Sequence, residues 1–351
     1  MTIDFGGQGE IAFEKRGRAG LVRLTRPAAL NALSHSMVRA LRRALVAWEG
    51  DPEVHCVVVE GEGRAFCAGG DILAVYHATK AGAAPYDFFA DEYRLNAHIK
   101  RYPKPYVALI DGIVMGGGVG ISVHGSHRVV TENALFAMPE VGIGFFPDVG
   151  GSAFLPHMPD EFGLYLALTG NRIRQGDCLA SGFATHAIAA EDKIAIREKL
   201  VETGDPDKAL AGRTIEKDFE TPADTRRTIT ACFGADTLEE CLKRLSSAEA
   251  QGDEAAMAFL ATLGSRSPTS LQVTFRQVRQ GKALTMDDCM RMEFRIVARM
   301  LEGHDLFEGI RATLIDKGDT PKWQPANLSS LKPETVDHYF ASLTDRELTL
   351  P

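Results

Sequence analysis

The sequence lacks several features that would define whole classes of protein. Its six cysteines include no CxxC pair, which argues against the common structural zinc sites and dithiol redox motifs. The longest apolar stretch, residues 107–123, contains Asp111 and five glycines, so it is a poor candidate for a membrane span. Basic residues do not predominate, because 39 Lys and Arg face 47 Asp and Glu, for a net charge of −8. This balance gives no sign of a nucleic-acid-binding surface.

Two further absences concern compartment and cofactors. The opening segment MTIDFGGQGEIAFEKRGRAG has no apolar h-region of a secretory signal. We therefore expect a cytoplasmic protein with reduced, buried thiols. The histidines form no HExxH motif, and the glycines form no convincing dinucleotide fingerprint in a strand–turn–helix context. We expect neither a metal site nor a bound cofactor.

Hydrophobic periodicity predicts alternating strands and helices in the first part of the chain. Residues 11–26 alternate in two runs around a glycine turn, as in a hairpin of two strands. Apolar residues three to four positions apart after Ser34 predict an amphipathic helix. The short β-branched run at 54–61 predicts a buried strand, and a helical segment is expected over 73–101.

The pattern changes near residue 205. Beyond it, strand-like runs stop and the segments are helical, as in LEECLKRLSSAEA and DDCMRMEFRIVARMLEG. We predict an α/β core over 1–205 that carries the active site, and a helical region over 206–351 that packs on it. Within that region, Glu293 and Arg295 are interpreted as part of a solvated helix face.

Glycine is the abundant residue that matters here, with 34 in the chain. The segments GEGRAFCAGGDI and DGIVMGGGVG each follow a predicted strand and precede a helix. At such junctions, glycine lets backbone N–H groups approach a ligand closely, and two N–H groups aimed at one oxygen form an oxyanion hole. Tight turns and close packing are the alternative explanation for either segment taken alone.

A third segment, MPEVGIGFFPDVGG, carries two acids, Glu140 and Asp148. Gly142, Gly144 and Pro147 make a helix implausible between them, whereas a loop can bring both carboxylates toward one point. One acid could then act as base or nucleophile, and the other as proton donor or hydroxyl acceptor. The alternative is that Asp148 caps the following helix and Glu140 caps a turn.

Taken together, these segments resemble the crotonase (enoyl-CoA hydratase/isomerase) superfamily, and most closely its 3-hydroxyisobutyryl-CoA hydrolase branch. The resemblance runs through RAFCAGGDI, KPYVALIDGIVMGGGVGISVHG, ALFAMPEVGIGFFPDVGG and EGHDLFEGIRATLIDKGDTPKWQP, and so covers nearly the whole chain. It implies an α/β fold, a crotonase-like spiral of ββα turns with a helical carboxyl-terminal extension. It also implies an acyl-CoA substrate, with CoA arriving as part of that substrate.

The resemblance also implies roles for individual residues. Gly70 and Gly117 would donate the oxyanion-hole N–H groups, and Gly117 would also contact the substrate. Glu140 would attack the thioester carbon or activate water, and Asp148 would bind the substrate 3-hydroxyl or transfer a proton. Glu92, in DEYRLN, would contact the substrate. Lys317, in LIDKGD, is left open between a contact to the CoA phosphates and an ordinary solvated lysine.

One departure bears on the reaction. Hydratases of the superfamily carry a second Glu just after the glycine triplet, and here that position is Gly120. The resemblance therefore implies hydrolysis of 3-hydroxyisobutyryl-CoA, or of a similar short 3-hydroxyacyl-CoA, as in valine breakdown. An enoyl-CoA hydratase or isomerase that uses Glu140 alone is the first alternative, and a non-catalytic acyl-CoA-binding protein is the second. A homo-oligomer is compatible with the superfamily, but the longer carboxyl terminus could cover the surface used for it.

Overall fold

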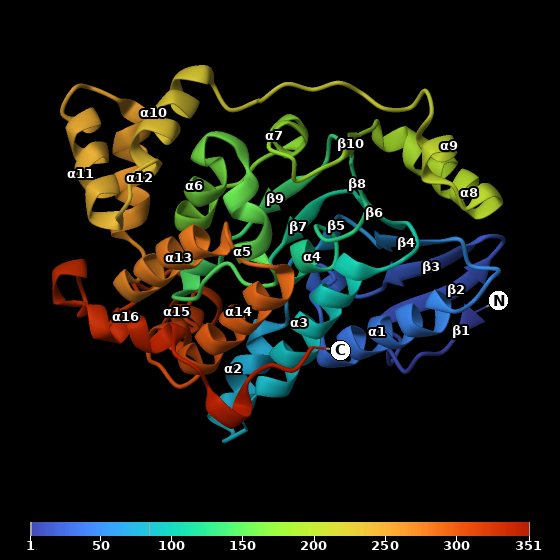
Figure 1. Cartoon of the computed structure of the whole chain (residues 1–351), viewed down its shortest axis with the longest axis horizontal. Coiled ribbons are helices and arrows are strands. Elements are labelled where there is room, and N and C mark those ends of the chain that lie inside the picture. The colour runs from blue at the N-terminus through green and yellow to red at the C-terminus, as the bar shows by residue number, and fades with distance from the viewer. Residues whose placement is uncertain (1, 84, 351) are drawn as a thin grey trace. The chain divides into compact units, whose positions relative to one another are not determined.

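The structure is a computed structural model that describes residues 2–83 and 85–350, and it divides into two units (Figure 1). The first unit contains the chain up to Asp71, then Asp91–Phe136 and Ile173–Glu220. The second contains Ile72–Ala90, Ala137–Arg172 and the described chain from Thr221 onward. This division does not coincide with the predicted boundary at 205, because two earlier segments cluster with the carboxyl-terminal helices.

The strands form two sheets. The larger sheet has the order β1-β2-β3-β4-β6-β8-β10, in which β1, β2 and β3 pair antiparallel and the pairs from β3 onward are parallel. Its strands are β1 (Thr2–Ile3), β2 (Ile11–Arg16), β3 (Ala19–Leu24), β4 (Cys56–Gly61), β6 (Tyr106–Ile110), β8 (His127–Val130) and β10 (His186–Ala187). The smaller sheet, β5-β7-β9, consists of β5 (Ala65–Cys67), β7 (Ile113–Met115) and β9 (Leu135–Ala137). The predicted hairpin and the predicted strand at 54–61 are both confirmed.

Helices of the first unit cover both faces of the larger sheet. The helices of this unit are α1 (His35–Glu49), α4 (Gly117–Gly120), α7 (Gln175–Ala180), α8 (Lys193–Thr203) and α9 (Pro206–Leu210), and α3 (Tyr86–Arg101) has residues in both units. Of these, α4 contacts β5 and β7 of the smaller sheet. On one face, Leu21 and Val58 join a buried apolar cluster with Ile196 and Leu200 of α8. On the other face, Trp48 of α1 packs edge-to-face on Phe13.

The second unit is built from helices, as the pattern beyond residue 205 predicts. These helices are α2 (Ile72–Lys80), α5 (Gly151–Phe154), α6 (Phe162–Thr169), α10 (Ala223–Phe233), α11 (Leu238–Glu249), α12 (Glu254–Gly264), α13 (Pro268–Gly281), α14 (Met286–Met300), α15 (Asp305–Ile310) and α16 (Pro333–Phe340). Within this unit, α5 packs against both α13 and α14 (Figure 1). Together with the two sheets, these helices give the chain the predicted α/β class with carboxyl-terminal helices.

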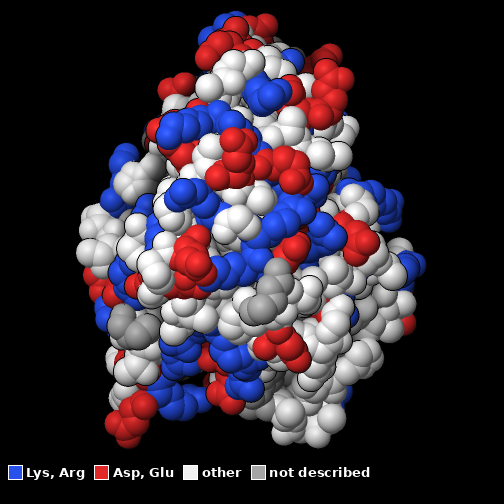
Figure 2. Space-filling model, turned by 90° about the vertical axis from the view of Figure 1, so that its right-hand side faces the viewer, with Lys and Arg blue, Asp and Glu red and all other residues white. Residues whose placement is uncertain are grey.

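The surface carries charges of both signs. On the face shown in Figure 2, basic and acidic side chains are interspersed, in keeping with the modest net charge of −8. Across residues 2–83 and 85–350, no helix combines the length and apolar character needed to cross a bilayer.

All six cysteines are free thiols in buried positions. Burial raises the pKa of Cys56, Cys67, Cys241 and Cys289 to about 12, so these thiols are protonated at neutral pH. We expect the native protein to react with a chromogenic disulfide at least about tenfold more slowly than the same protein in guanidinium chloride, because the thiolate is the reactive form. Stopped-flow absorbance measures both rates, and rapid labelling of the native protein would contradict the burial.

Candidate active site

Gly70 lies where its N–H is directed away from the neighbouring chain segment. It forms a parallel bridge with Leu33, in which the Leu33 N–H donates to the Gly69 carbonyl at 2.8 Å and the Asp71 N–H donates to the Leu33 carbonyl at 2.9 Å. Because successive peptide groups of extended backbone point to opposite sides, the Gly70 N–H faces away from Leu33. This orientation suits an N–H that serves a ligand.

Gly117 and Glu92 lie beside Gly70 in the first unit. A Cβ placed on Gly117 would be 3.1 Å from the Gly70 nitrogen and only 2.6 Å from Oε1 of Glu92, so a larger residue would displace one of them. Gly117 is the first residue of α4, where N–H groups have no acceptor within the helix. Glu92 is buried on α3. The structure thus brings together three of the predicted site residues: two glycine amides and one carboxylate.

Glu140 and Asp148 both belong to the second unit, and both are buried. Glu140 begins a 3₁₀ helix, Glu140–Ile143, and its carbonyl accepts a hydrogen bond from the Phe145 N–H at 3.1 Å. Asp148 precedes a tight turn that leads into α5. The N-cap position of α5 is Gly150, so Asp148 is not the capping residue of that helix. Between the acids, this single 3₁₀ turn is followed by an irregular segment from Gly144 to Pro147, so no continuous helix joins them, as predicted.

Polar side chains of α13 hold this loop by its backbone. The Ser270 hydroxyl donates to the Phe145 carbonyl, and the Gln277 amide donates to the Pro147 carbonyl at 2.6 Å. Both side chains are fully buried. Sequence reasoning did not identify them, although both lie on the apolar face of a helix, where a polar residue is unusual.

The interpretation of Glu293 as part of a solvated helix face is wrong. Its relative exposure is 0%, and its carboxylate accepts hydrogen bonds from the Gly150 N–H at 2.8 Å, from the Ser152 N–H at 3.0 Å and from the Ser152 hydroxyl. Glu293 therefore holds the turn directly after Asp148. The sequence contained a signal for this, because residues three and four positions away on both sides, such as Met290 and Val297, are apolar.

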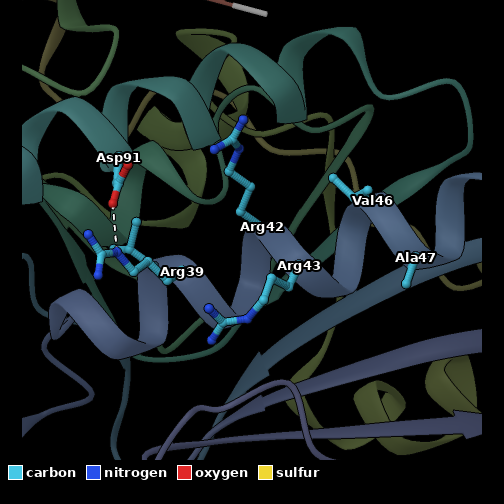
Figure 3. A pocket seen from close by; sticks show the side chains of 7 residues that line it. Arg39, Arg42, Arg43, Val46, Ala47 and Asp91 are labelled. Atoms are coloured by element: carbon cyan, nitrogen blue, oxygen red, sulfur yellow. Dashed lines mark hydrogen bonds and ion pairs between the residues drawn. The ribbon is translucent and has the colours of Figure 1, made fainter.

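A separate pocket of about 500 Å³ lies beside α1 in the first unit (Figure 3). Its lining includes Arg39, Arg42, Arg43 and the exposed Val46 of α1, and Arg39 pairs with Asp91 of α3 at 2.8 Å. None of the predicted catalytic or oxyanion residues lines it. It gives no support to the predicted chemistry.

Two predictions remain, the role of Lys317 and the expected absence of a metal site. The Lys317 side chain is exposed, which is compatible with either of its two readings. Over residues 2–83 and 85–350, no group of three or more His, Cys, Asp and Glu side chains is arranged to hold a metal ion.

Comparison with known proteins identifies relatives along nearly the full chain. A rat protein named 3-hydroxyisobutyryl-CoA hydrolase, mitochondrial, is 44% identical over 97% of this chain and 90% of its own length. The human protein of the same name is 42% identical with the same two coverages. A crystal structure of a carnitinyl-CoA dehydratase from Mycobacterium thermoresistibile superimposes with a TM-score of 0.91 at 43% identity, covering 97% of this chain and 98% of that one.

The names of these relatives contradict the predicted cytoplasmic location, because the hydrolases are designated mitochondrial. The prediction depended on a missing apolar h-region, which is evidence against a secretory signal only. Mitochondrial transit peptides are amphipathic and contain no such region, so the absence was uninformative. We withdraw that prediction.

A crystal structure of an enoyl-CoA hydratase from Rhodobacter sphaeroides is also similar, with a TM-score of 0.87 and 38% identity over 97% of this chain and all of that one. These structures confirm the crotonase fold. The model of the enoyl-CoA hydratase/isomerase family matches residues 19–340. The chain therefore belongs to the enoyl-CoA hydratase/isomerase family.

Proposed function

We propose that this protein hydrolyses the thioester of 3-hydroxyisobutyryl-CoA to 3-hydroxyisobutyrate and free CoA. The observation that carries the proposal is identity above 40%, along almost the whole chain, to proteins named for that activity. The reaction requires the acyl-CoA and water, and the proposal includes no metal or redox cofactor. A homo-oligomer stays a prediction.

The glycine amides of the first unit are proposed to polarise the thioester. The Gly70 and Gly117 N–H groups donate to the carbonyl oxygen, which gains negative charge when the carbonyl carbon is attacked. Losing one such donor typically costs an enzyme about 3 kcal/mol of transition-state stabilisation. Support comes from the local geometry, because a Cβ on Gly117 would lie 3.1 Å from the Gly70 nitrogen and both amides lie at positions where the backbone provides no acceptor for them.

Glu140 is proposed to carry out the attack by one of two routes. As a general base, it takes a proton from water while the water oxygen bonds to the carbonyl carbon and the C–S bond breaks. As a nucleophile, its carboxylate displaces the CoA thiolate to form a mixed anhydride, which water then cleaves. In both routes the thiolate leaves with the electrons of the C–S bond and is then protonated.

Asp148 and Glu92 are proposed to bind the acyl group. Asp148 accepts a hydrogen bond from the 3-hydroxyl, or transfers a proton to the leaving group, and Glu92 contacts the substrate beside the oxyanion amides. A carboxylate that is buried and fixed can discriminate strongly, because a substrate without the hydroxyl leaves it without that partner.

Hydration of an enoyl-CoA is the competing function, because the two similar crystal structures are of proteins named as a carnitinyl-CoA dehydratase and an enoyl-CoA hydratase. The residue Gly120 argues against hydration. Its position lies within the buried helix α4 and provides no carboxylate to share the added water with Glu140. A binding protein without catalysis is a weaker alternative, because both acids and both glycine segments are present.

A thioester panel tests the proposal directly. We expect the purified protein to release free thiol from 3-hydroxyisobutyryl-CoA, with less release from longer or unhydroxylated acyl-CoAs, measured with a chromogenic disulfide. The buried cysteines keep the background of this assay low. In a parallel assay, the absorbance of the conjugated double bond of an unsaturated thioester should stay unchanged on the timescale of thiol release. Loss of that absorbance without thiol release would establish the hydratase instead.

A further inference from the structure

Asp148 leads into a turn whose backbone is strained at Val149. The Gly151 N–H donates to the Asp148 carbonyl at 2.8 Å, and the two central residues have positive φ, 51° at Val149 and 90° at Gly150. Turns of this kind normally carry Asn or Gly at both centres. A β-branched residue adopts positive φ only when its surroundings impose it, and such strain is found preferentially at functional sites.

Glu293 of α14 holds the strained turn on the side that follows Asp148. Its Oε2 accepts from the Gly150 N–H at 2.8 Å, and its Oε1 accepts from the Ser152 N–H at 3.0 Å and from the Ser152 hydroxyl. Gln277 of α13 holds the other side through the Pro147 carbonyl at 2.6 Å. The backbone is therefore fixed immediately before and immediately after Asp148.

The negative charge of Asp148 affects the pKa of Glu293. Burial raises the pKa of Glu293 to about 8, the hydrogen bonds from Ser152 and Gly150 oppose this rise, and the negative charge of Asp148 adds to it. A fully buried carboxyl beside a second acid is an unfavourable arrangement for stability. Its contacts are concentrated on the one turn that carries Asp148, which indicates a role in that turn.

We infer that Glu293 is a positioning residue, which holds the strained turn and thereby directs the Asp148 carboxylate at the 3-hydroxyl of the substrate. The inference rests on the proposed function, which gives Asp148 that hydroxyl as its partner. Glu293 does not touch the substrate. Its effect is on recognition of hydroxylated acyl groups and passes entirely through Asp148.

The test compares two substrates that differ only in the hydroxyl, 3-hydroxyisobutyryl-CoA and isobutyryl-CoA. The measured quantity is the hydroxyl preference, defined as the ratio of their kcat/KM values. Glu293→Gln replaces one acceptor oxygen by an NH₂ group that cannot accept from the turn, so we expect the preference to fall about tenfold or more. Ser152→Ala removes one of the three hydrogen bonds and should lower it about threefold.

Glu347 provides the matched control. It accepts from Arg295 of α14 at 2.8 Å, from the Ser342 hydroxyl at 2.9 Å and from the Leu343 N–H at 2.9 Å, so it holds a backbone segment as Glu293 does. These partners are different from the residues that hold the Asp148 turn. Glu347→Gln should lower the unfolding midpoint in urea and leave the hydroxyl preference within about twofold of wild type.

A double-mutant cycle completes the experiment. Asp148→Asn should remove the preference, and adding Glu293→Gln to it should lower the preference no further, because the two residues act through one contact. Equal losses on both substrates in Glu293→Gln, or additive losses in the double variant, would overturn the inference. If Glu293→Gln does not fold, the same two criteria apply to Ser152→Ala. If Asp148→Asn itself keeps the preference, the role proposed for Asp148 is wrong and the inference falls with it.

Discussion

Glu140→Gln is expected to lower kcat for 3-hydroxyisobutyryl-CoA by about 10³-fold, because the amide can neither take a proton from water nor attack the thioester carbon. The amide has nearly the same shape as the carboxylate, and the Glu140 carbonyl keeps its 3.1 Å hydrogen bond from the Phe145 N–H. We therefore expect KM to change little. Steady-state thiol release with purified protein measures both constants.

Glu334→Gln is the control for the loss of one negative charge. Glu334 is exposed in the first turn of α16, where its charge has only a small effect on helix stability. Its kcat should equal that of wild type. If Glu140→Gln turned over at the wild-type rate, the assignment of Glu140 would be wrong for hydrolase and hydratase alike.

An isotope experiment tests the nucleophilic route proposed for Glu140. In a single turnover in H₂¹⁸O, this route leaves ¹⁸O in the Glu140 side chain when water attacks the anhydride at the enzyme's carboxyl carbon. The general-base route leaves the Glu140 oxygens unlabelled, as does attack at the substrate carbonyl carbon, so incorporated label establishes the nucleophilic route. Mass spectrometry of the peptide that contains Glu140 reads out the label.

Local patterns predicted elements well where neighbours in sequence decide the structure. The β-branched run at 54–61 forms β4, and the periodic segment after Ser34 forms α1 with Ser34 as its N-cap. The segment 73–101 is different, because it was predicted as one helix and forms α2 and α3. Gly82, with φ of 84°, and Pro85 separate these helices. Both residue types break helices, but the prediction gave more weight to the apolar pattern.

The site was predictable only in part. The glycine and acid motifs drew attention to Gly70, Gly117 and Glu140 because their chemistry depends on residue types that are visible in short segments. Glu293 was missed because its partners, Gly150 and Ser152, lie more than a hundred positions away along the chain. No local pattern reports such a contact. The position of Glu293 on the apolar face of α14 was the available warning, since a buried acid requires partners.

Gly163→Ala is expected to destabilise the fold by about 3 kcal/mol, at the upper end of what overpacking usually costs. Gly163 lies in the buried helix α6, where a Cβ would be 1.9 Å from the carbonyl oxygen of Leu155 and 2.6 Å from its carbonyl carbon. Both are backbone atoms, so rotation of a side chain cannot relieve the clash. Either α6 or the short helical turn at Leu155–His157 has to move.

Gly264→Ala makes the same chemical change where there is room for it. Gly264 ends α12, and a Cβ there would have no neighbour within 4 Å. Alanine should stabilise the protein by about 0.5 kcal/mol, because it lowers the conformational entropy of the unfolded chain. Urea unfolding of both variants and of wild type should therefore show that the free energy of unfolding falls in Gly163→Ala and rises in Gly264→Ala. Stabilisation by both substitutions would mean that the helix preference of alanine decides both cases, and that α6 does not pack against Leu155 as described.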